Sequence, residues 1–449
     1  MSREAILMGT ERDTRSGSTR CLIQWKPDST INGHGLIVGA SGVGKTHRLR
    51  YIATNLAYNY GARVIIIDVH GDITVDGEQR AIFNETSPYG LNPLKVNPDP
   101  ASGGVNRRIR GFISMINRTS HRLGARQEAA MRRLVEDIYE KNGFDASDHR
   151  TWDPRNNPDA RGRSKSQGVY PNISDLKRYS LYKYKQMMTG AGGEAFKALQ
   201  ELNKAIKSLN KQVLRTHNDI AEKHALDYLS PEDSAKLKKL KERAKGSYAE
   251  FVDSAKTGDE VNDLLRYTDI PTLASLVDRI DHLDKSGIFK DAPPNFSSGN
   301  GVHVYDIHSL GRDEQQMFVD VLLEDLWNEQ KSKGPVHTPN TFIIMDEASI
   351  FVNDDSDHII NILIREARKF GLGIVFASQS INHFSEDVLA NVGFKLILGV
   401  DQMFIAQMAR MLRVEASKIE DIRPRQTALI QCKVIGDQKN DYTDIFLSR

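Results

Sequence analysis

Gly39-Ala40-Ser41-Gly42-Val43-Gly44-Lys45-Thr46 is the stretch of this 449-residue chain that decides its fold. It has the G-x-x-x-x-G-K-T spacing of a phosphate-binding loop. Glycines let backbone amides close around phosphate oxygens, and the start of the following helix adds a favourable dipole. In such a loop the lysine neutralises the β- and γ-phosphates, and the threonine hydroxyl ligates Mg²⁺. The stretch predicts a site for ATP and Mg²⁺ in which Lys45 acts on the phosphates and Thr46 on the metal.

The flanking sequence supplies the strand and the helix that this loop requires. The apolar run Gly35-Leu36-Ile37-Val38 precedes the loop and is short enough for a buried strand. Apolar residues then recur at helical spacing, and Gly61 is placed to end that helix. These residues are Leu49, Ile52, Ala53, Leu56 and Ala57.

A second stretch, Thr341-Phe342-Ile343-Ile344-Met345-Asp346-Glu347, is an apolar strand that ends in two carboxylates. Opposite a phosphate loop, Asp346 would hold Mg²⁺ and Glu347 would orient or deprotonate the attacking water. Many α/β proteins have strands that end in an acidic turn, so this prediction depends on the intact loop upstream. The next predicted strand ends in Ser378-Gln379. The Gln379 amide either senses the γ-phosphate or bonds to a nearby turn.

Arg365 and Arg368 share the polar face of the helix predicted after the acidic strand. The apolar residues of that helix occupy its other face, so neither arginine is needed for the core. Two interpretations stay open. The face is either a solvated basic surface or carries an arginine finger that reaches the ATP of a neighbouring subunit in a ring.

Strands and helices alternate on both sides of a long helical stretch, which predicts an α/β fold with a parallel sheet covered on both faces. Right-handed crossovers make this sheet RecA-like. We predict an N-terminal hairpin or extension over 1–34 and the first part of the ATPase domain over 35–97. A helical insertion follows over 98–300, and the second part of the domain covers 301–449, with its last strand over 427–434.

The overall composition excludes few partners, since the net charge is only +2. Two distant cysteines, no apolar run of membrane-spanning length and no apolar leader predict a cytoplasmic protein with no membrane span. Basic residues concentrate in the insertion and would attract a phosphate backbone, although such a face is usually only solvated. They are Arg107, Arg108, Arg110, Arg118, Arg122, Arg126, Arg132, Arg133, Lys177, Arg178, Lys183, Lys185, Lys197, Lys204, Lys207, Lys211 and Arg215.

Taken in order, the motifs resemble those of the HerA–FtsK superfamily of ring-shaped P-loop motor ATPases. The resemblance is strongest to HerA-type DNA translocases and to the ATPases of conjugative type IV secretion. It rests on residues 39–46, Ile67-Asp68-Val69-His70-Gly71-Asp72, Leu91-Asn92-Pro93-Leu94, Asp346-Glu347, Arg365-Glu366-Ala367-Arg368-Lys369-Phe370-Gly371 and Ser378-Gln379.

The resemblance implies that Lys45, Thr46, Asp346, Glu347 and Gln379 form the ATP site, and that a trans finger is to be sought at Arg365 or Arg368. The chain departs from the family in having no transmembrane hairpin and, in place of an N-terminal barrel, at most a hairpin. Asp68, His70 and Asp72 lie at and just after the end of the strand over 63–68. They either touch the site or form a structural turn, and we favour the turn.

Three functions fit these features. The first is an ATP-driven translocase of DNA, expected to be duplex, that works as a homo-hexamer, with a nuclease or secretion-system partner. The second is a secretion or conjugation ATPase that acts mainly on protein. The third is a nucleotide-gated binding subunit with weak turnover.

Overall fold

The computed structural model describes residues 3–12, 21–155, 169–189, 201, 203–208, 231–254, 267, 269–297, 299–353, 355–437 and 440–448. The chain divides into two compact units. The first comprises Met1–Pro93, Met115–His121 and Lys285–Arg449, and the second comprises Leu94–Ser114 and Arg122–Asp284. Among the described helices, none is both long and apolar enough to cross a bilayer.

The first unit is built on one sheet with the strand order β2-β1-β11-β10-β9-β3-β8-β7-β4-β6-β5. Neighbouring strands are parallel from β9 to β5 and antiparallel from β9 to β2. The predicted α/β fold with a mainly parallel sheet is confirmed. The strands are β1 (Ile6–Glu11), β2 (Leu22–Trp25), β3 (Gly35–Val38), β4 (Arg63–Asp68), β5 (Gln79–Ile82), β6 (Gly301–Asp306), β7 (Val336–Met345), β8 (Phe370–Ser378), β9 (Phe394–Ile397), β10 (Thr427–Cys432) and β11 (Thr443–Leu447).

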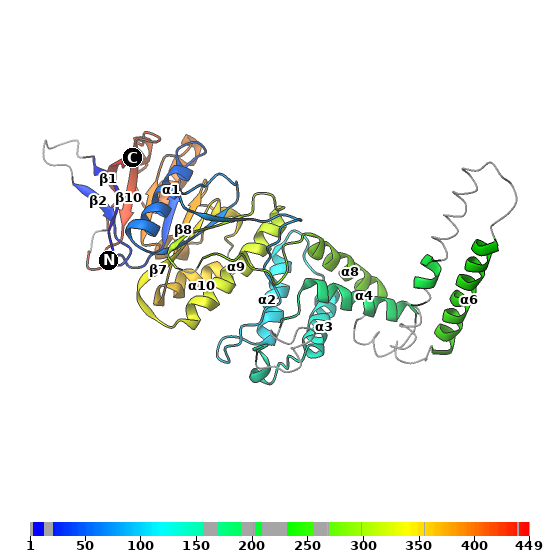
Figure 1. Ribbon diagram of the computed structural model, residues 1–449. Helices are drawn as coiled ribbons and strands as arrows, with labels where there is room; N and C mark the ends of the chain where they lie inside the picture. The colour runs from blue at the N-terminus through cyan, green and yellow to red at the C-terminus, as the bar shows by residue number, and fades with distance from the viewer. Residues whose placement is uncertain are drawn as a thin grey trace, which may run out of the picture. The chain divides into compact units, whose positions relative to one another are not determined.

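Helices cover both faces of this sheet (Figure 1). Along β4, Val64 and Ile66 share a buried cluster with residues of α1 (Lys45–Thr54). The intervening Ile65 and Ile67 are fully buried and lie outside that cluster, because successive strand residues point to opposite faces. The second face is covered by α9 (Arg312–Ser332) and α10 (Ile359–Glu366), which pack against each other, while α9 also contacts β8.

The last strand of the predicted ATPase domain corrects one expectation. We predicted residues 427–434 as a further parallel strand, but β10 is antiparallel to β9. The two helices between them, α12 (Gln402–Leu412) and α13 (Ala416–Glu420), do not return the chain to the other end of the sheet. β10 therefore begins at the edge where β9 ends, and the turn that precedes β10 lies at the carboxyl edge of the sheet.

The two edges of the sheet are formed by strands from the first part of the chain. β1 and β2 pair antiparallel, and β2 is an outermost strand. At the opposite edge lies β5, which sequence analysis missed. Its sequence, Gln-Arg-Ala-Ile, has neither an apolar run nor a clear alternation, so only its pairing with β6 defines it.

The described elements of the second unit are helices. They are the first part of α2 (Val105–Arg118), with α3 (Ala125–Lys141), α4 (Ile173–Thr189), α6 (Pro231–Ser254), most of α8 (Ile270–Lys285) and a short 3₁₀ turn, His149–Thr151. The apolar face of α3 is buried, as its helical spacing predicts. Lys197, Lys211 and Arg215 of the predicted basic set lie outside the described residues.

Candidate active site

The candidate site lies where four neighbouring strands end. β3, β8, β7 and β4 are adjacent and parallel, so their carboxyl ends meet at one edge of the sheet. Backbone hydrogen bonds join these ends: the Gly39 amide donates to the Ser378 carbonyl (3.2 Å), and the Asp346 amide donates to the Ile67 carbonyl (3.4 Å). Motifs that are far apart in the sequence thus become neighbours.

The phosphate loop has the backbone that its glycines allow. Gly42 and Gly44 have φ angles of 79° and 105°, a region that side chains disfavour, and α1 begins directly after the loop at Lys45. The Lys45 ammonium is buried and donates to the carbonyls of Gly39 (2.9 Å) and Ala40 (3.0 Å). Burial lowers the pKa of Lys45, while Glu347 and Asp346 oppose that shift. The loop therefore holds the positively charged Lys45 ammonium where a phosphate group can bind to it.

The acidic pair forms the other side of the site. Asp346 is buried and accepts a hydrogen bond from the Glu347 amide (3.0 Å). Burial raises the pKa of Asp346, and the negative charges of Asp72 and Glu347 raise it further, although nearby His70 lowers it. A carboxylate in this setting gains stability from a cation. Glu347 has a φ of 45°, and such an outlier away from glycine is typical of functional sites.

Gln379 reaches this pair from the next strand. Its side-chain amide donates to one carboxylate oxygen of Glu347 (3.1 Å), and the Ser349 hydroxyl donates to the other (2.8 Å). These two contacts fix the orientation of the Glu347 carboxylate. The structure thus places Gln379 beside the predicted catalytic glutamate, and its role toward a γ-phosphate stays a prediction.

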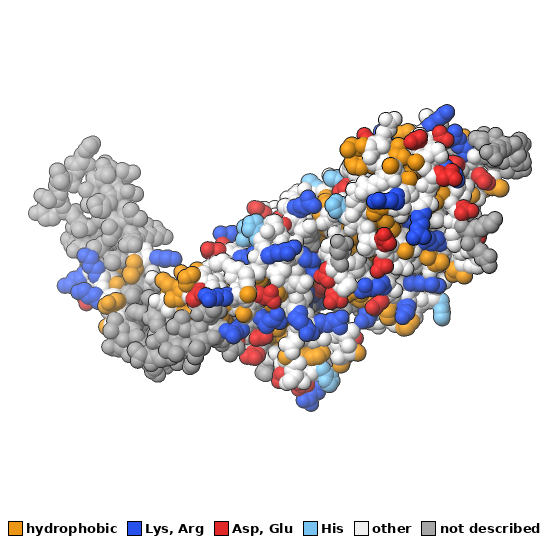
Figure 2. All heavy atoms as spheres, turned by 180° about the vertical axis from the view of Figure 1, so that it is seen from behind, with side chains coloured by type: hydrophobic (Ala, Val, Ile, Leu, Met, Phe, Trp, Pro, Cys, Tyr) orange, Lys and Arg blue, Asp and Glu red, His pale blue; other side chains and the backbone are white. Residues whose placement is uncertain are grey.

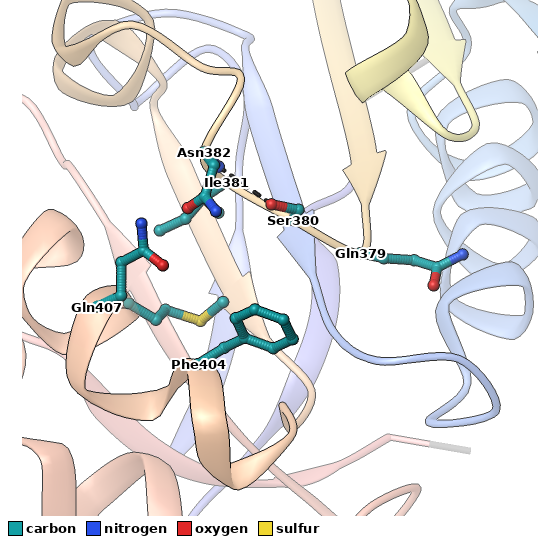
Figure 3. A pocket seen from close by; sticks show the side chains of 7 residues that line it. Gln379, Ser380, Ile381, Asn382, Phe404 and Gln407 are labelled. Carbon is teal, nitrogen blue, oxygen red and sulfur yellow. Dashed lines mark hydrogen bonds between the residues drawn. The ribbon is translucent and has the colours of Figure 1, made fainter.

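A small pocket borders Gln379 but is not the nucleotide site. Its volume is about 30 Å³, which leaves room for only a few water molecules. Ser380, Ile381, Asn382, Phe404, Gln407 and Met408 line it together with Gln379. The Gln379 side chain extends away from Phe404 and Gln407, out of this pocket (Figure 3).

The carboxylates at the strand ends offer a donor set that fits Mg²⁺. Oxygen atoms of Asp68, Asp72 and Asp346 all lie within 4.8 Å of one another, and the Thr46 hydroxyl is 3.5 Å from Asp72. Magnesium prefers oxygen ligands of this kind and retains several waters.

Asp68 and Asp72 differ in how many hydrogen bonds their carboxylate oxygens already accept from the protein. Asp68 accepts from the amides of Gly71 (2.8 Å) and Ile73 (3.1 Å) and from the Arg80 guanidinium (3.1 Å). It therefore forms the predicted structural turn. The same turn carries Asp72 to the side of Thr46, which agrees with the less favoured interpretation that this stretch also touches the site.

Arg365 and Arg368 are both exposed, as predicted, but their local structure differs. α10 ends at Glu366, and Arg368 lies in a 3₁₀ turn that leads directly into β8. The Arg365 guanidinium donates to the Ser356 carbonyl (2.7 Å). In the described part of the chain, the Arg368 side chain has no hydrogen-bond or ion-pair partner. Of the two, Arg368 has the less constrained side chain.

Comparison with known proteins finds similarity to HerA in part of the chain. Residues 21–237 match the family model described as the central domain of helicase HerA. The DNA double-strand break repair helicase HerA of Pyrococcus furiosus is 31% identical over 97 residues, which are 20% of this chain and 18% of that protein. The predicted resemblance to HerA-type ATPases is confirmed.

Two solved structures share the fold of this chain over nearly its whole length. VirB4 of Thermoanaerobacter pseudethanolicus superposes with a TM-score of 0.61 at 14% identity, over 99% of this chain and 96% of VirB4. The plasmid coupling protein TrwB, solved with a non-hydrolysable ATP analogue, gives a TM-score of 0.52 at 13% identity, over 100% of this chain and 95% of TrwB. The predicted RecA-like fold is confirmed.

Sequence analysis missed one further residue at the candidate site. The Arg425 side chain donates from Nε to the Gly42 carbonyl of the phosphate loop (3.0 Å). Arg425 precedes β10, and only the antiparallel direction of β10 brings it to this edge. The one sequence signal is the cluster Arg423-Pro424-Arg425, which alone does not distinguish a turn from a site.

Proposed function

We propose that this protein is an ATP-hydrolysing motor that translocates duplex DNA as a homo-hexameric ring. The observation that carries the proposal is the meeting of the phosphate loop, Asp346-Glu347 and Gln379 at the ends of neighbouring strands. The HerA central-domain match supports DNA as the partner. The DNA substrate, the ring and a nuclease or secretion-system partner are parts of the proposal.

In the proposed reaction, each side chain acts on a different part of ATP. Residues 39–46 cradle the phosphates with backbone amides, and Lys45 neutralises charge on the β- and γ-phosphates. Glu347, oriented by Ser349 and Gln379, positions the attacking water and accepts its proton. Water attacks the γ-phosphorus as the bond to the β-phosphate oxygen breaks, which leaves ADP and inorganic phosphate.

Thr46 and Asp346 would hold Mg²⁺, with Asp72 close enough to support it. When bound, the ion supplies positive charge to the phosphate oxygens. We expect Asp346→Asn to remove most of the gain in ADP affinity that Mg²⁺ confers, about tenfold or more, since the amide keeps the shape but not the charge. Titration calorimetry with and without Mg²⁺ measures this gain. Asp387→Asn, an exposed aspartate on α11 (Glu386–Asn391), is the matched control.

Because the pKa of Asp346 is raised, the Mg²⁺-dependent gain should shrink as the pH falls through that raised value. The Mg²⁺-free affinity of Asp346→Asn should equal that of the wild type. An undiminished Mg²⁺ gain in the variant would remove Asp346 from the metal site.

The structure reduces the set of basic residues available to DNA. Among the described residues, at least six of them pair with carboxylates, three with carboxylates distant in the sequence and three with carboxylates one helical turn away. These are Lys177 with Asp281 and Asp284, Arg118 with Asp320, Arg126 with Asp269, Arg132 with Glu128, Arg178 with Asp175 and Lys204 with Glu201. On the face in Figure 2, blue and red side chains intermingle without a single-sign patch. Arg107, Arg110, Arg122 and Lys207 are exposed with no partner in the described chain.

Arg107 and Arg110 are three residues apart on α2, so they share one helical face. If this face binds DNA, Arg107→Gln with Arg110→Gln should flatten the log–log salt dependence of duplex binding by about 0.9 per lost phosphate contact. DNA-stimulated ATPase activity should fall with it. The paired Lys204→Gln is the control, since its charge is already balanced by Glu201. An unchanged slope in the double variant would mean that this face of α2 is a solvated surface and does not bind DNA.

The second candidate is a secretion or conjugation ATPase whose main partner is protein. The fold likeness to VirB4 over nearly the whole chain favours it. ATPase rates with and without duplex DNA separate the two: stimulation by DNA supports the translocase. Turnover that ignores DNA but rises with a secretion-channel protein supports the alternative.

A further inference from the structure

Arg425 occupies a turn whose backbone favours a different residue. The turn spans Arg423 to Gln426, with the Gln426 amide donating to the Arg423 carbonyl (3.0 Å) and Pro424 in its second position. Its third residue, Arg425, has a φ of 64°. Turns with proline second and positive φ third usually have glycine or asparagine there. The arginine is thus retained against the preference of the backbone, and such outliers concentrate at functional sites.

The turn is joined to the phosphate loop by the hydrogen bond from Arg425 to Gly42, at the exposed tip of the loop. The loop is also held at Gly399, which lies next to Pro424 and whose own carbonyl accepts a hydrogen bond from the Ala40 amide (2.9 Å). The guanidinium therefore lies beside the loop that would carry the phosphates.

Only one of the three guanidinium nitrogens is used. Nε donates to Gly42, whereas the two terminal nitrogens of Arg425 have no partner in the described part of the chain. Arg425 is exposed, so burial does not oppose its charge. A planar guanidinium with free terminal donors matches phosphate oxygens.

We infer that Arg425 is a nucleotide-binding residue: it braces the tip of the phosphate loop through Gly42 and supplies a second positive charge, beside that of Lys45, to the polyphosphate of a bound nucleotide. The inference rests on the proposed ATPase function. It adds a residue from the far end of the chain to the site, and makes the α13–β10 turn part of nucleotide binding.

Arg425→Gly tests this inference, because it should weaken nucleotide binding without lowering the stability of the protein. Glycine adopts a positive φ without strain, so the variant should melt at the same temperature as the wild type or higher. Loss of one charge-assisted contact should weaken nucleotide binding about tenfold or more. Arg413→Gly is the matched control: Arg413 is exposed, has a φ of 55° and ends α12, with no contact to the loop in the described chain.

Calorimetric titration of the full-length variants with ADP and with a non-hydrolysable ATP analogue completes the test. Weaker binding of both ligands by Arg425→Gly places the guanidinium at the β-phosphate, and weaker binding of the ATP analogue alone places it at the γ-phosphate. Arg425→Gln, which removes the charge without changing the backbone preference much, should reproduce the loss.

Wild-type affinity in both Arg425 variants, with a wild-type protein that binds nucleotide, overturns the inference and leaves the proposed function standing. A wild-type protein that binds neither ligand overturns both. An equal loss in Arg413→Gly would show that relief of backbone strain, not the guanidinium, changes affinity, and would also overturn the inference.

Discussion

Glu347→Gln should bind ATP and fail to turn it over. The substitution keeps the size and one oxygen of the side chain but removes the base that accepts the proton of the attacking water. General-base catalysis contributes about two to four orders of magnitude, and we expect kcat to fall by that amount. ATP affinity should stay within about twofold of wild type, since the phosphate loop and Asp346 are unchanged. Single-turnover hydrolysis beside equilibrium binding measures the two effects separately.

Lys45→Ala provides the contrasting variant. It removes the ammonium that the loop carbonyls of Gly39 and Ala40 hold in place, so nucleotide affinity and hydrolysis should both fall. For Glu347→Gln, the control is Glu140→Gln at an exposed position on α3, which removes a carboxylate away from the site. Near-wild-type hydrolysis in Glu347→Gln would exclude Glu347 as the base. The contact from Gln379 would then no longer serve to orient a catalytic carboxylate.

Arg368→Ala should abolish hydrolysis while ATP still binds. An arginine finger is worth about three to five orders of magnitude in turnover where another subunit or protein supplies it. Arg368 suits this role better than Arg365, because the Arg365 side chain already bonds to the Ser356 carbonyl. Should Arg368→Ala retain activity, Arg365→Ala is expected to show the loss. Lys369→Ala, an exposed cation in the same turn, is the matched control.

Mixing two inactive proteins tests whether the finger acts between subunits. Arg368→Ala retains an intact phosphate loop, and Lys45→Ala retains an intact finger. A mixed ring therefore contains interfaces that have both, and part of the activity should return. Native mass measurement with ATP and duplex DNA establishes that mixed rings form. No recovery in such rings would contradict a trans finger at this position, and a protein that stays monomeric under these conditions would exclude the ring.

The sequence alone determined the features that depend on neighbouring residues. The glycines of residues 39–46 allow the positive φ angles of a phosphate loop, and their spacing before Lys45-Thr46 identifies that loop. The apolar runs before that loop and before Asp346 are too short for helices and fully apolar, as buried parallel strands are. Because carboxyl ends of parallel strands meet at one edge, the meeting of the loop with the acidic pair was also predictable.

Only the tertiary structure decided the features that depend on chain direction and on distant partners. The antiparallel course of β10 brings Arg425 to Gly42, and no local pattern specifies that direction. Lys177 belongs to a basic cluster in the sequence, yet Asp281 and Asp284 balance its charge in the folded protein. Hydrogen bonds and ion pairs act over a few ångströms of space whatever the separation along the chain, so these contacts exist only once the elements are packed.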